Sequence, residues 1–150
     1  MTAIAVNSEV GRLRTVMLHR PGTELTRLTP HNKDGLLFDE ILWPDLAQRE
    51  HDRFAELLCS RGVEVVYLET LLAEALALDE AREQVLSRLC DERRLGRAAA
   101  DLLRGLLLEE SPAALGDHLI GGLTVADAVA ECRAAGMRIG NVAERSATLP

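Results

Sequence analysis

The chain has 150 residues, of which 47% are hydrophobic and 27% are charged. This length and balance predict one globular core of ordinary size and exclude a fibrous or disordered chain. Its 17 basic and 24 acidic residues give a formal net charge of −7, which argues against a nucleic-acid partner.

The amino-terminal segment carries Glu9, Arg12 and Arg14 and has no apolar block of the kind that directs secretion. No later stretch is long and apolar enough to cross a bilayer. We therefore expect a cytoplasmic protein with no membrane partner.

Residues 13–19 form the first predicted strand, because they are rich in strand-forming side chains and end at Pro21-Gly22. We expect this strand to be largely buried. Residues 23–43 show no sustained periodicity and predict a long loop, with a further strand hidden in it as an alternative. Loops of this length are usually functional or disordered, so this one is the first place to look for a site.

A helix is predicted over residues 46–61, with Asp45 and Gln48 as a capping box and Gly62 as its left-handed terminator. Residues 63–68 form the second predicted strand. Because a helix connects the strands, we expect parallel pairing through a right-handed crossover. The helix face expected to be buried carries Ala47, His51, Phe54 and Leu58.

From residue 70 the composition shifts to alanine, leucine, glutamate and arginine at helical spacing, which predicts a helical part. The predicted helices cover residues 71–76, 80–92, 97–108, 112–120 and 125–135. The expected caps are Thr70, Asp79, Ser111 and Thr124 with Asp127, and the expected stops are Gly121, Gly122 and Gly136. We therefore divide the chain into residues 1–69, residues 70–136 and a tail at 137–150.

The most unusual feature of the long loop is the segment Leu36-Leu37-Phe38-Asp39-Glu40, in which three large apolar residues precede two carboxylates. Such a loop can close over a pocket, with Asp39 or Glu40 meeting a cation such as a guanidinium. In the alternative, which the residues alone favour, the apolar side chains anchor the loop in the core and the acids are solvated.

The histidines and cysteines give weaker signals. We expect His51 to be a hydrogen-bonded core residue, since its helix lacks the second histidine of a zinc motif. The isolated histidines are His19, His31 and His118, and the cysteines are Cys59, Cys90 and Cys132. No cysteine stands beside glycine-rich backbone that could form an oxyanion hole, so we interpret all three as reduced packing residues. The sequence indicates no metal site and no cofactor.

Several segments together resemble the amino-terminal part of bacterial arginine deiminases. They are residues 7–22 (NSEVGRLRTVMLHRPG), 27–30 (RLTP), 36–39 (LLFD), 50–54 (EHDRF), 61–65 (RGVEV), 71–72 (LL) and, more loosely, 118–122 (HLIGG). The resemblance implies an α/β fold, with residues 1–69 as one strand-helix unit of an α/β propeller and residues 70–136 as an inserted helical bundle. It also implies hydrolysis of L-arginine to L-citrulline and ammonia without a cofactor.

Residue by residue, the resemblance places a pocket-covering loop on residues 29–39 and a substrate-contacting leucine on Leu37, but it assigns no role to Asp39 or Glu40. The family motif P-N-x-x-F-T-R-D is absent, as are the family's histidine and cysteine segments, and we expect no resemblance after Thr124. The expectation is thus an amino-terminal fragment that is inactive alone, with no catalytic residue of its own.

Two alternatives remain at this stage. One is a non-catalytic module that binds a partner or associates with itself through the helical part. The other is a related hydrolase or amidinotransferase of the guanidine-modifying group, which the combination of the Leu37 loop and the helical insert disfavours.

Overall fold

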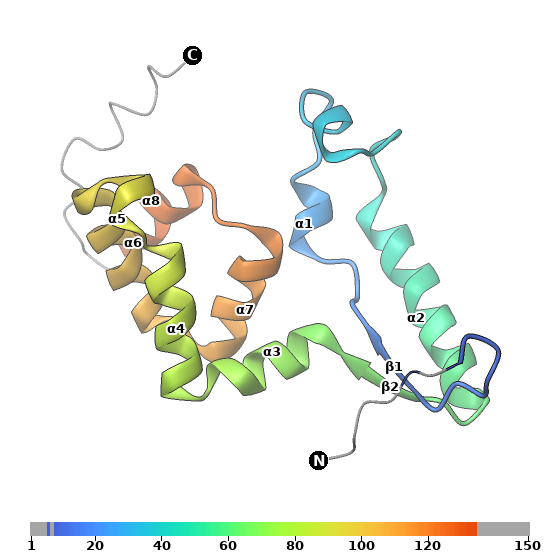
Figure 1. Cartoon of the computed structure of the whole chain (residues 1–150). Coiled ribbons are helices and arrows are strands. Elements are labelled where there is room, and N and C mark those ends of the chain that lie inside the picture. The colour runs from blue at the N-terminus through green and yellow to red at the C-terminus, as the bar shows by residue number, and fades with distance from the viewer. Residues whose placement is uncertain (1–5, 7, 135–150) are drawn as a thin grey trace.

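The computed structural model describes Val6 and residues 8–134, with side chains described up to residue 130. Figure 1 shows a small sheet with one long helix at one end of the molecule and a group of helices at the other, joined by α3. The elements in chain order are β1 (Thr15–Leu18), α1 (Thr23–Thr26), a 3-10 turn (Asp34–Leu36), α2 (Pro44–Ser60), β2 (Glu64–Tyr67), α3 (Leu68–Leu76), α4 (Asp79–Leu89), α5 (Glu92–Leu95), α6 (Arg97–Glu109), α7 (Pro112–Gly121) and α8 (Val125–Ala134). No helix among the described residues is long and apolar enough to span a membrane.

The two strands pair in parallel, from Thr15 opposite Glu64 to Leu18 opposite Tyr67, and α2 connects them. The α/β class and the parallel pairing are therefore confirmed. The prediction that β1 is largely buried is wrong, because its side chains alternate between exposed and half-buried and Met17 is 57% exposed. A sheet of two strands with one long helix beside it leaves much of its surface to solvent.

The start of α2 differs from the prediction. The helix begins at Pro44, a residue suited to the first turn because it has no N–H to leave unpaired, and no side chain caps it. The capping box of Asp45 and Gln48 is thus wrong: Gln48 Nε2 donates instead to the backbone oxygen of Pro21, at 2.8 Å. Gly62 follows the helix with a φ of 75°, as predicted for its terminator.

The predicted buried face of α2 is correct only in part. Ala47, His51 and Leu58 are half-buried, but Phe54 is 51% exposed and Ala55 is the buried residue. Positions 51, 55 and 58 lie on one helix face, so the face that packs on β2 is rotated by about one residue from the predicted one.

The helical part has its own core of leucines. Leu76, Leu86, Leu107 and Leu115, from α3, α4, α6 and α7, are buried against one another, and Leu72, Val85, Leu103, Leu119 and Leu123 pack around them. These side chains recur at helical spacing in the sequence, which is why the helices could be predicted.

Two of the predicted helix caps are confirmed. Ser111 Oγ accepts the N–H of Ala114 at 3.1 Å, and Thr124 and Asp127 cap each other reciprocally. The Thr70 and Asp79 caps are wrong, because both residues lie inside their helices. Gly122 ends α7 with a φ of 75°, whereas Gly136 and the predicted tail at 137–150 lie outside the described residues.

Candidate functional site

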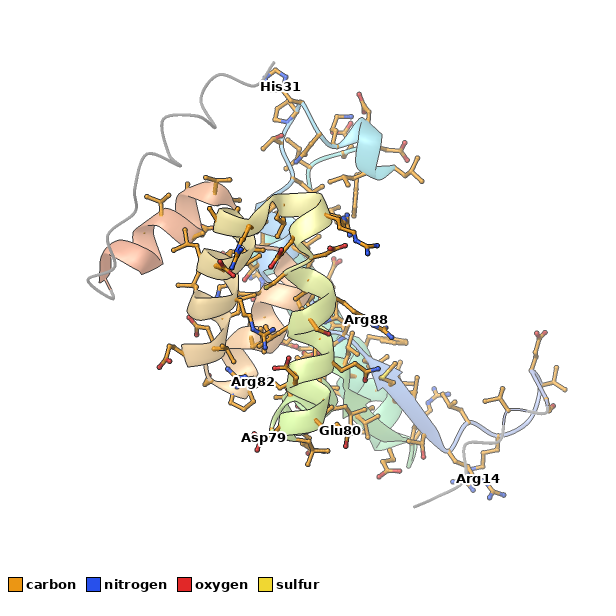
Figure 2. The ribbon with its side chains drawn as sticks, turned by 60° about the vertical axis from the view of Figure 1, so that its left-hand side comes forward. Arg14, His31, Asp79, Glu80, Arg82 and Arg88 are labelled. Atoms are coloured by element: carbon orange, nitrogen blue, oxygen red, sulfur yellow. The ribbon has the colours of Figure 1, made fainter. Side chains whose placement is uncertain are left out.

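The long loop of residues 23–43 contains two short helical turns and no strand, so the alternative of a hidden strand is wrong. Its first part is anchored in the molecule by Leu25 and Leu28, which are both buried. From Thr29 onward the loop extends away from the helices, and His31 lies at its outer end (Figure 2).

Leu37 is the most exposed of the large apolar residues in this loop. It is 93% exposed, and its neighbour Leu36 is also exposed, so the interpretation of these two as core anchors is wrong. Leu37 has a φ of 61° and a ψ of 33°, and it is the one non-glycine residue with positive φ that the structure describes. For an L-residue with a bulky side chain this left-handed conformation costs roughly 1–2 kcal/mol.

Hydrogen bonds hold the turn around Leu37 in this strained shape. The N–H of Leu37 donates to Asp34 O at 3.1 Å, and the N–H of Phe38 donates to Lys33 O at 2.9 Å. Lys33 Nζ donates to the backbone oxygen of Asp39 at 2.7 Å and to Asp34 Oδ1 at 2.9 Å. The side chains of Asp39 and Glu40 are exposed.

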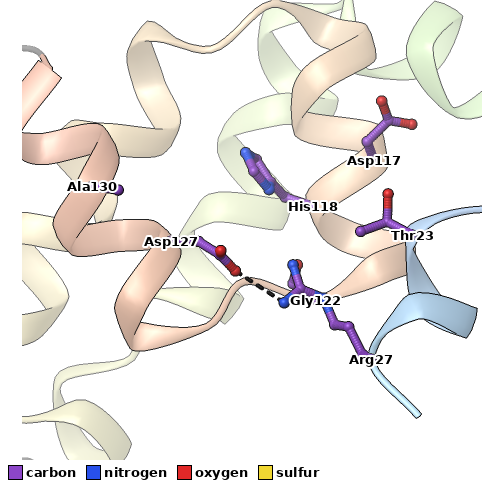
Figure 3. A pocket seen from close by; sticks show the side chains of 7 residues that line it. All are labelled: Thr23, Arg27, Asp117, His118, Gly122, Asp127 and Ala130. Atoms are coloured by element: carbon purple, nitrogen blue, oxygen red, sulfur yellow. Dashed lines mark hydrogen bonds and ion pairs between the residues drawn. The ribbon is translucent and has the colours of Figure 1, made fainter.

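The base of the loop is tied to the helical part through Arg27. Its Nη1 lies 2.9 Å from Asp127 Oδ2, and its Nη2 donates to the backbone oxygen of Gly122 at 3.1 Å. Figure 3 shows this pair beside a hollow of about 270 Å³ between α1, α7 and α8. The hollow is lined by Thr23, Arg27, Asp117, His118, Gly122, Asp127 and Ala130.

A second polar cluster lies where β1 ends. The His19 ring sits between Glu24 Oε1, at 3.1 Å from Nε2, and Glu69 Oε2, at 3.3 Å from Nδ1. Burial lowers the pKa of His19, but the hydrogen bonds and charges of Glu69 and Glu24 outweigh it, so the pKa is raised overall. Arg20 N also donates to Glu69, so three elements, β1, α1 and α3, meet at this point.

Beside this cluster, Arg20 forms a two-pronged ion pair with Asp52 on α2, at 2.8 and 2.9 Å. This pair lowers the pKa of Asp52. The His51 side chain is only 13% exposed, and its ring lies 6.0 Å from that of Tyr67. His51 is shielded as predicted, but the expected hydrogen bond is not found within the described residues: Asp52 Oδ1 lies 3.6 Å from Nδ1, beyond hydrogen-bond distance.

The cysteines show no catalytic setting in the described part of the chain. Cys59 is exposed on α2, and Cys90 is half-buried at the end of α4, where burial raises the pKa of its thiol. Cys132 belongs to α8, and its side chain is outside the described residues. Within the described residues, no group of three histidine, cysteine or carboxylate side chains could hold a metal ion.

Sequence reasoning singled out Leu37 but missed the two polar clusters, at His19 and at Arg27. The available signal was that His19, Arg20, Gly22 and Arg27 all fall in segments that resemble the deiminases. Polar residues concentrated in such segments, away from any apolar periodicity, indicate specific contacts rather than packing.

A family model described as arginine deiminase matches residues 34–145, and this range passes Thr124, where the resemblance was expected to end. The arginine deiminase of Mycobacterium marinum is 52% identical over 127 residues, which cover 85% of this chain and 32% of that protein. The arginine deiminase of Rhodococcus erythropolis is 50% identical over 122 residues, covering 81% of this chain and 30% of that protein. The chain therefore spans about a third of the length of the curated relatives it matches.

Proposed function

Because the chain belongs to the arginine deiminase family, we propose that it supplies the pocket-covering loop and the helical insert of an enzyme that hydrolyses L-arginine to L-citrulline and ammonia. In this proposal residues 1–69 are the first strand-helix unit of an α/β propeller, and residues 70–136 are the inserted bundle. The parallel pair of β1 and β2 around α2, followed directly by α3, supports this division.

The observation that carries the proposal is the conformation of Leu37. A leucine that is 93% exposed and held at positive φ has no reason to be there for the stability of this chain. Such strained residues cluster at ligand clamps and active sites. In the proposal Leu37 contacts the substrate: its side chain covers the bound arginine and excludes water from the reacting guanidinium.

In this proposal the described residues do not carry out the chemistry itself. Deimination needs a nucleophile, a base and acids that hold the guanidinium. Among the described residues Cys59 has no hydrogen-bonded base beside it, and the raised pKa of Cys90 lowers the fraction of its thiolate. The carboxylates of Glu24 and Glu69 are already engaged with the imidazole of His19. In the proposal the reacting groups come from sequence that corresponds to the other two-thirds of the relatives.

The test is a chimera in which this chain replaces the segment of the Mycobacterium marinum enzyme that aligns with it. We expect the chimera to form citrulline from L-arginine, while the 150-residue chain alone forms none. An inactive but folded chimera, or turnover by the chain alone after all three cysteines are replaced, would contradict the proposal.

Two variants of the chimera test the role of Leu37. Leu37→Ala should raise the KM for arginine, because the side chain that covers the substrate is shortened. Leu36→Ala is the matched control: it removes an equally large, exposed side chain one residue earlier and should leave KM unchanged. Equal effects of both changes would argue against a specific contact by Leu37.

A second candidate function is self-association, and the exposed apolar surface around the sheet favours it. Met17 on β1 and Phe54 and Leu57 on α2 are more than half exposed, and β1 and β2 each have one unpaired edge within the described sheet. Such edges and apolar surfaces drive association of chains.

A further inference from the structure

We propose that Arg27 and Asp127 are positioning residues whose ion pair couples the helical part of the chain to the loop that presents Leu37. This inference rests on the proposed function of that loop, and it concerns how the loop is held. Arg27 stands at the base of the loop and Asp127 in the first turn of α8. The two residues therefore connect segments that are far apart in the sequence.

Arg27 forms contacts through both its side chain and its backbone. Its guanidinium contacts Asp127 and donates to the backbone oxygen of Gly122, 95 positions later in the chain. Its own backbone oxygen accepts from Nδ2 of Asn32 at 2.9 Å, and Asn32 Oδ1 accepts the N–H of Thr29 at 2.7 Å. One residue thus joins the helical part to the first turn of the loop.

The hydrogen bonds continue from Asn32 to Leu37. Asn32 O accepts the N–H of Leu36 at 3.1 Å, and the neighbouring Lys33 O accepts the N–H of Phe38 at 2.9 Å. Leu37 lies between these two bonded residues. Its position is therefore linked to Arg27 through a continuous set of short-range hydrogen bonds.

The base of the loop has little room to move independently of α7. Leu25 and Leu28 are buried, and Gly121 packs so closely that a Cβ there would lie 3.0 Å from Cβ of Thr23. The Arg27 side chain is 28% exposed, and its Nε is shielded from solvent. A displacement of α7 or α8 would consequently be passed to α1 and to the loop.

Asp127 is held in the direction that Arg27 requires. The N–H and the hydroxyl of Thr124 donate to Asp127 Oδ2 at 3.0 and 2.6 Å. These two bonds, followed by that from Arg27, lower the pKa of Asp127 to about 2. The carboxylate is therefore ionised, and the bonds from Thr124 orient it toward the guanidinium.

Amide hydrogen exchange on the whole 150-residue chain tests the coupling. Asp127→Asn keeps an oxygen that can accept from Thr124 but removes the charge that holds Arg27. We expect the amides of residues 36–38 to exchange about two- to fivefold faster, as for loss of one partly exposed ion pair, while α4 and α6 keep their rates. Arg27→Lys should give a smaller change than Arg27→Ala.

Asp101→Asn is the matched control, because it neutralises an exposed carboxylate of α6 that pairs with Arg97 at 3.9 Å and touches no part of the loop. It should leave residues 36–38 unchanged. The coupling is refuted if Asp127→Asn leaves these amides at the original rate, or if it accelerates every helix equally. These measurements contain no arginine, so an inactive chimera would contradict the proposed function and leave the exchange result standing.

Discussion

The backbone conformation at position 37 favours glycine, although the residue there is leucine. Glycine adopts positive φ without the steric cost that a Cβ brings, and the exposed leucine side chain gains little from burial. If the leucine is retained for its contact with a substrate, replacing it should improve stability while it impairs binding.

We therefore expect Leu37→Gly to raise the free energy of unfolding by about 1 kcal/mol, since relief of roughly 1–2 kcal/mol of strain exceeds the entropy that glycine loses on folding. Urea denaturation would measure this. Leu36→Gly, at a position without positive φ, should instead lower stability by roughly 0.5–1 kcal/mol. Loss of stability in both variants would show that Leu37 is not strained.

His19 is expected to make stability depend on pH. Its pKa in the folded chain is raised above the ordinary 6.5. The stabilisation from Glu24 and Glu69 is therefore fully present below 6.5 and is lost as the pH rises through the raised value. Asp52 and Asp127, whose pKa values are lowered, stay ionised across this window and do not contribute.

The measurement is the urea midpoint on either side of that window, in the unmodified chain and in His19→Gln. The unmodified chain should lose stability from the acidic to the alkaline side, and the variant should lose less. His31→Gln, at the exposed outer end of the loop, serves as control and should behave as the unmodified chain does (Figure 2). If the urea midpoint of His19→Gln fell with pH as much as that of the unmodified chain, the pH dependence would belong to another group.

The sequence led to Leu37 as a proposed substrate contact, but it does not explain the conformation of that residue. The resemblance selected this position, whereas the positive φ and the exposure depend on the hydrogen bonds of Lys33 and Asp34, which no periodicity predicts. Likewise, the partners of Arg27 lie about a hundred positions away and could only be found in three dimensions.

At the scale of elements, helix caps could be predicted from neighbouring residues where the end of the helix is exposed to solvent. Ser111 accepts the N–H of a residue three positions later, and Thr124 and Asp127, also three positions apart, cap each other. Both caps were predicted. Gln48 was misassigned because a tertiary partner, the backbone of Pro21, competes for its side chain. Phe54 was misplaced because the sheet beneath α2 has only two strands, which cover a narrow face.

Arg82 on α4 stabilises the packing of two helices. Its Nη2 donates to the backbone oxygens of Leu107, Leu108 and Glu110, at the end of α6, where carbonyls lack partners inside their own helix. We expect Arg82→Met, which keeps the apolar stem, to lower the free energy of unfolding by roughly 1.5–3 kcal/mol.

Arg88→Met on the same helix provides the control, because Arg88 is exposed (Figure 2). Its effect should stay within about 0.5 kcal/mol. Urea denaturation followed by circular dichroism measures both variants. Similar losses in the two would mean that the carbonyl contacts of Arg82 contribute nothing specific.

At the scale of the whole molecule, the sheet end and the helical end differ in the groups that they expose to solvent. The helical part encloses a cluster of buried leucines although it also exposes Leu78, whereas the sheet end exposes Met17, Phe54 and Leu57 together with unpaired strand edges of the described sheet. We expect Met17→Lys to shift the chain toward monomer in sedimentation velocity, because a charge on β1 opposes pairing of edges and apolar faces.

Leu78→Lys is the comparison variant for this measurement, since Leu78 is 65% exposed, more than Met17, but belongs to the helical part. It should leave the distribution of species unchanged. A purely monomeric unmodified chain would rule out self-association. The exposed sheet would then be expected to pack against the remaining segments of the chimera instead.

The parallel pairing of β1 and β2 also has a consequence for the timing of synthesis. Thr15 and its partner Glu64 are 49 positions apart, and the strands cannot pair until α2 has been made between them. At the usual speed of a ribosome, β1 is available roughly 2–10 seconds before β2. During that interval its mostly apolar sequence has no strand partner, and chaperones can bind it.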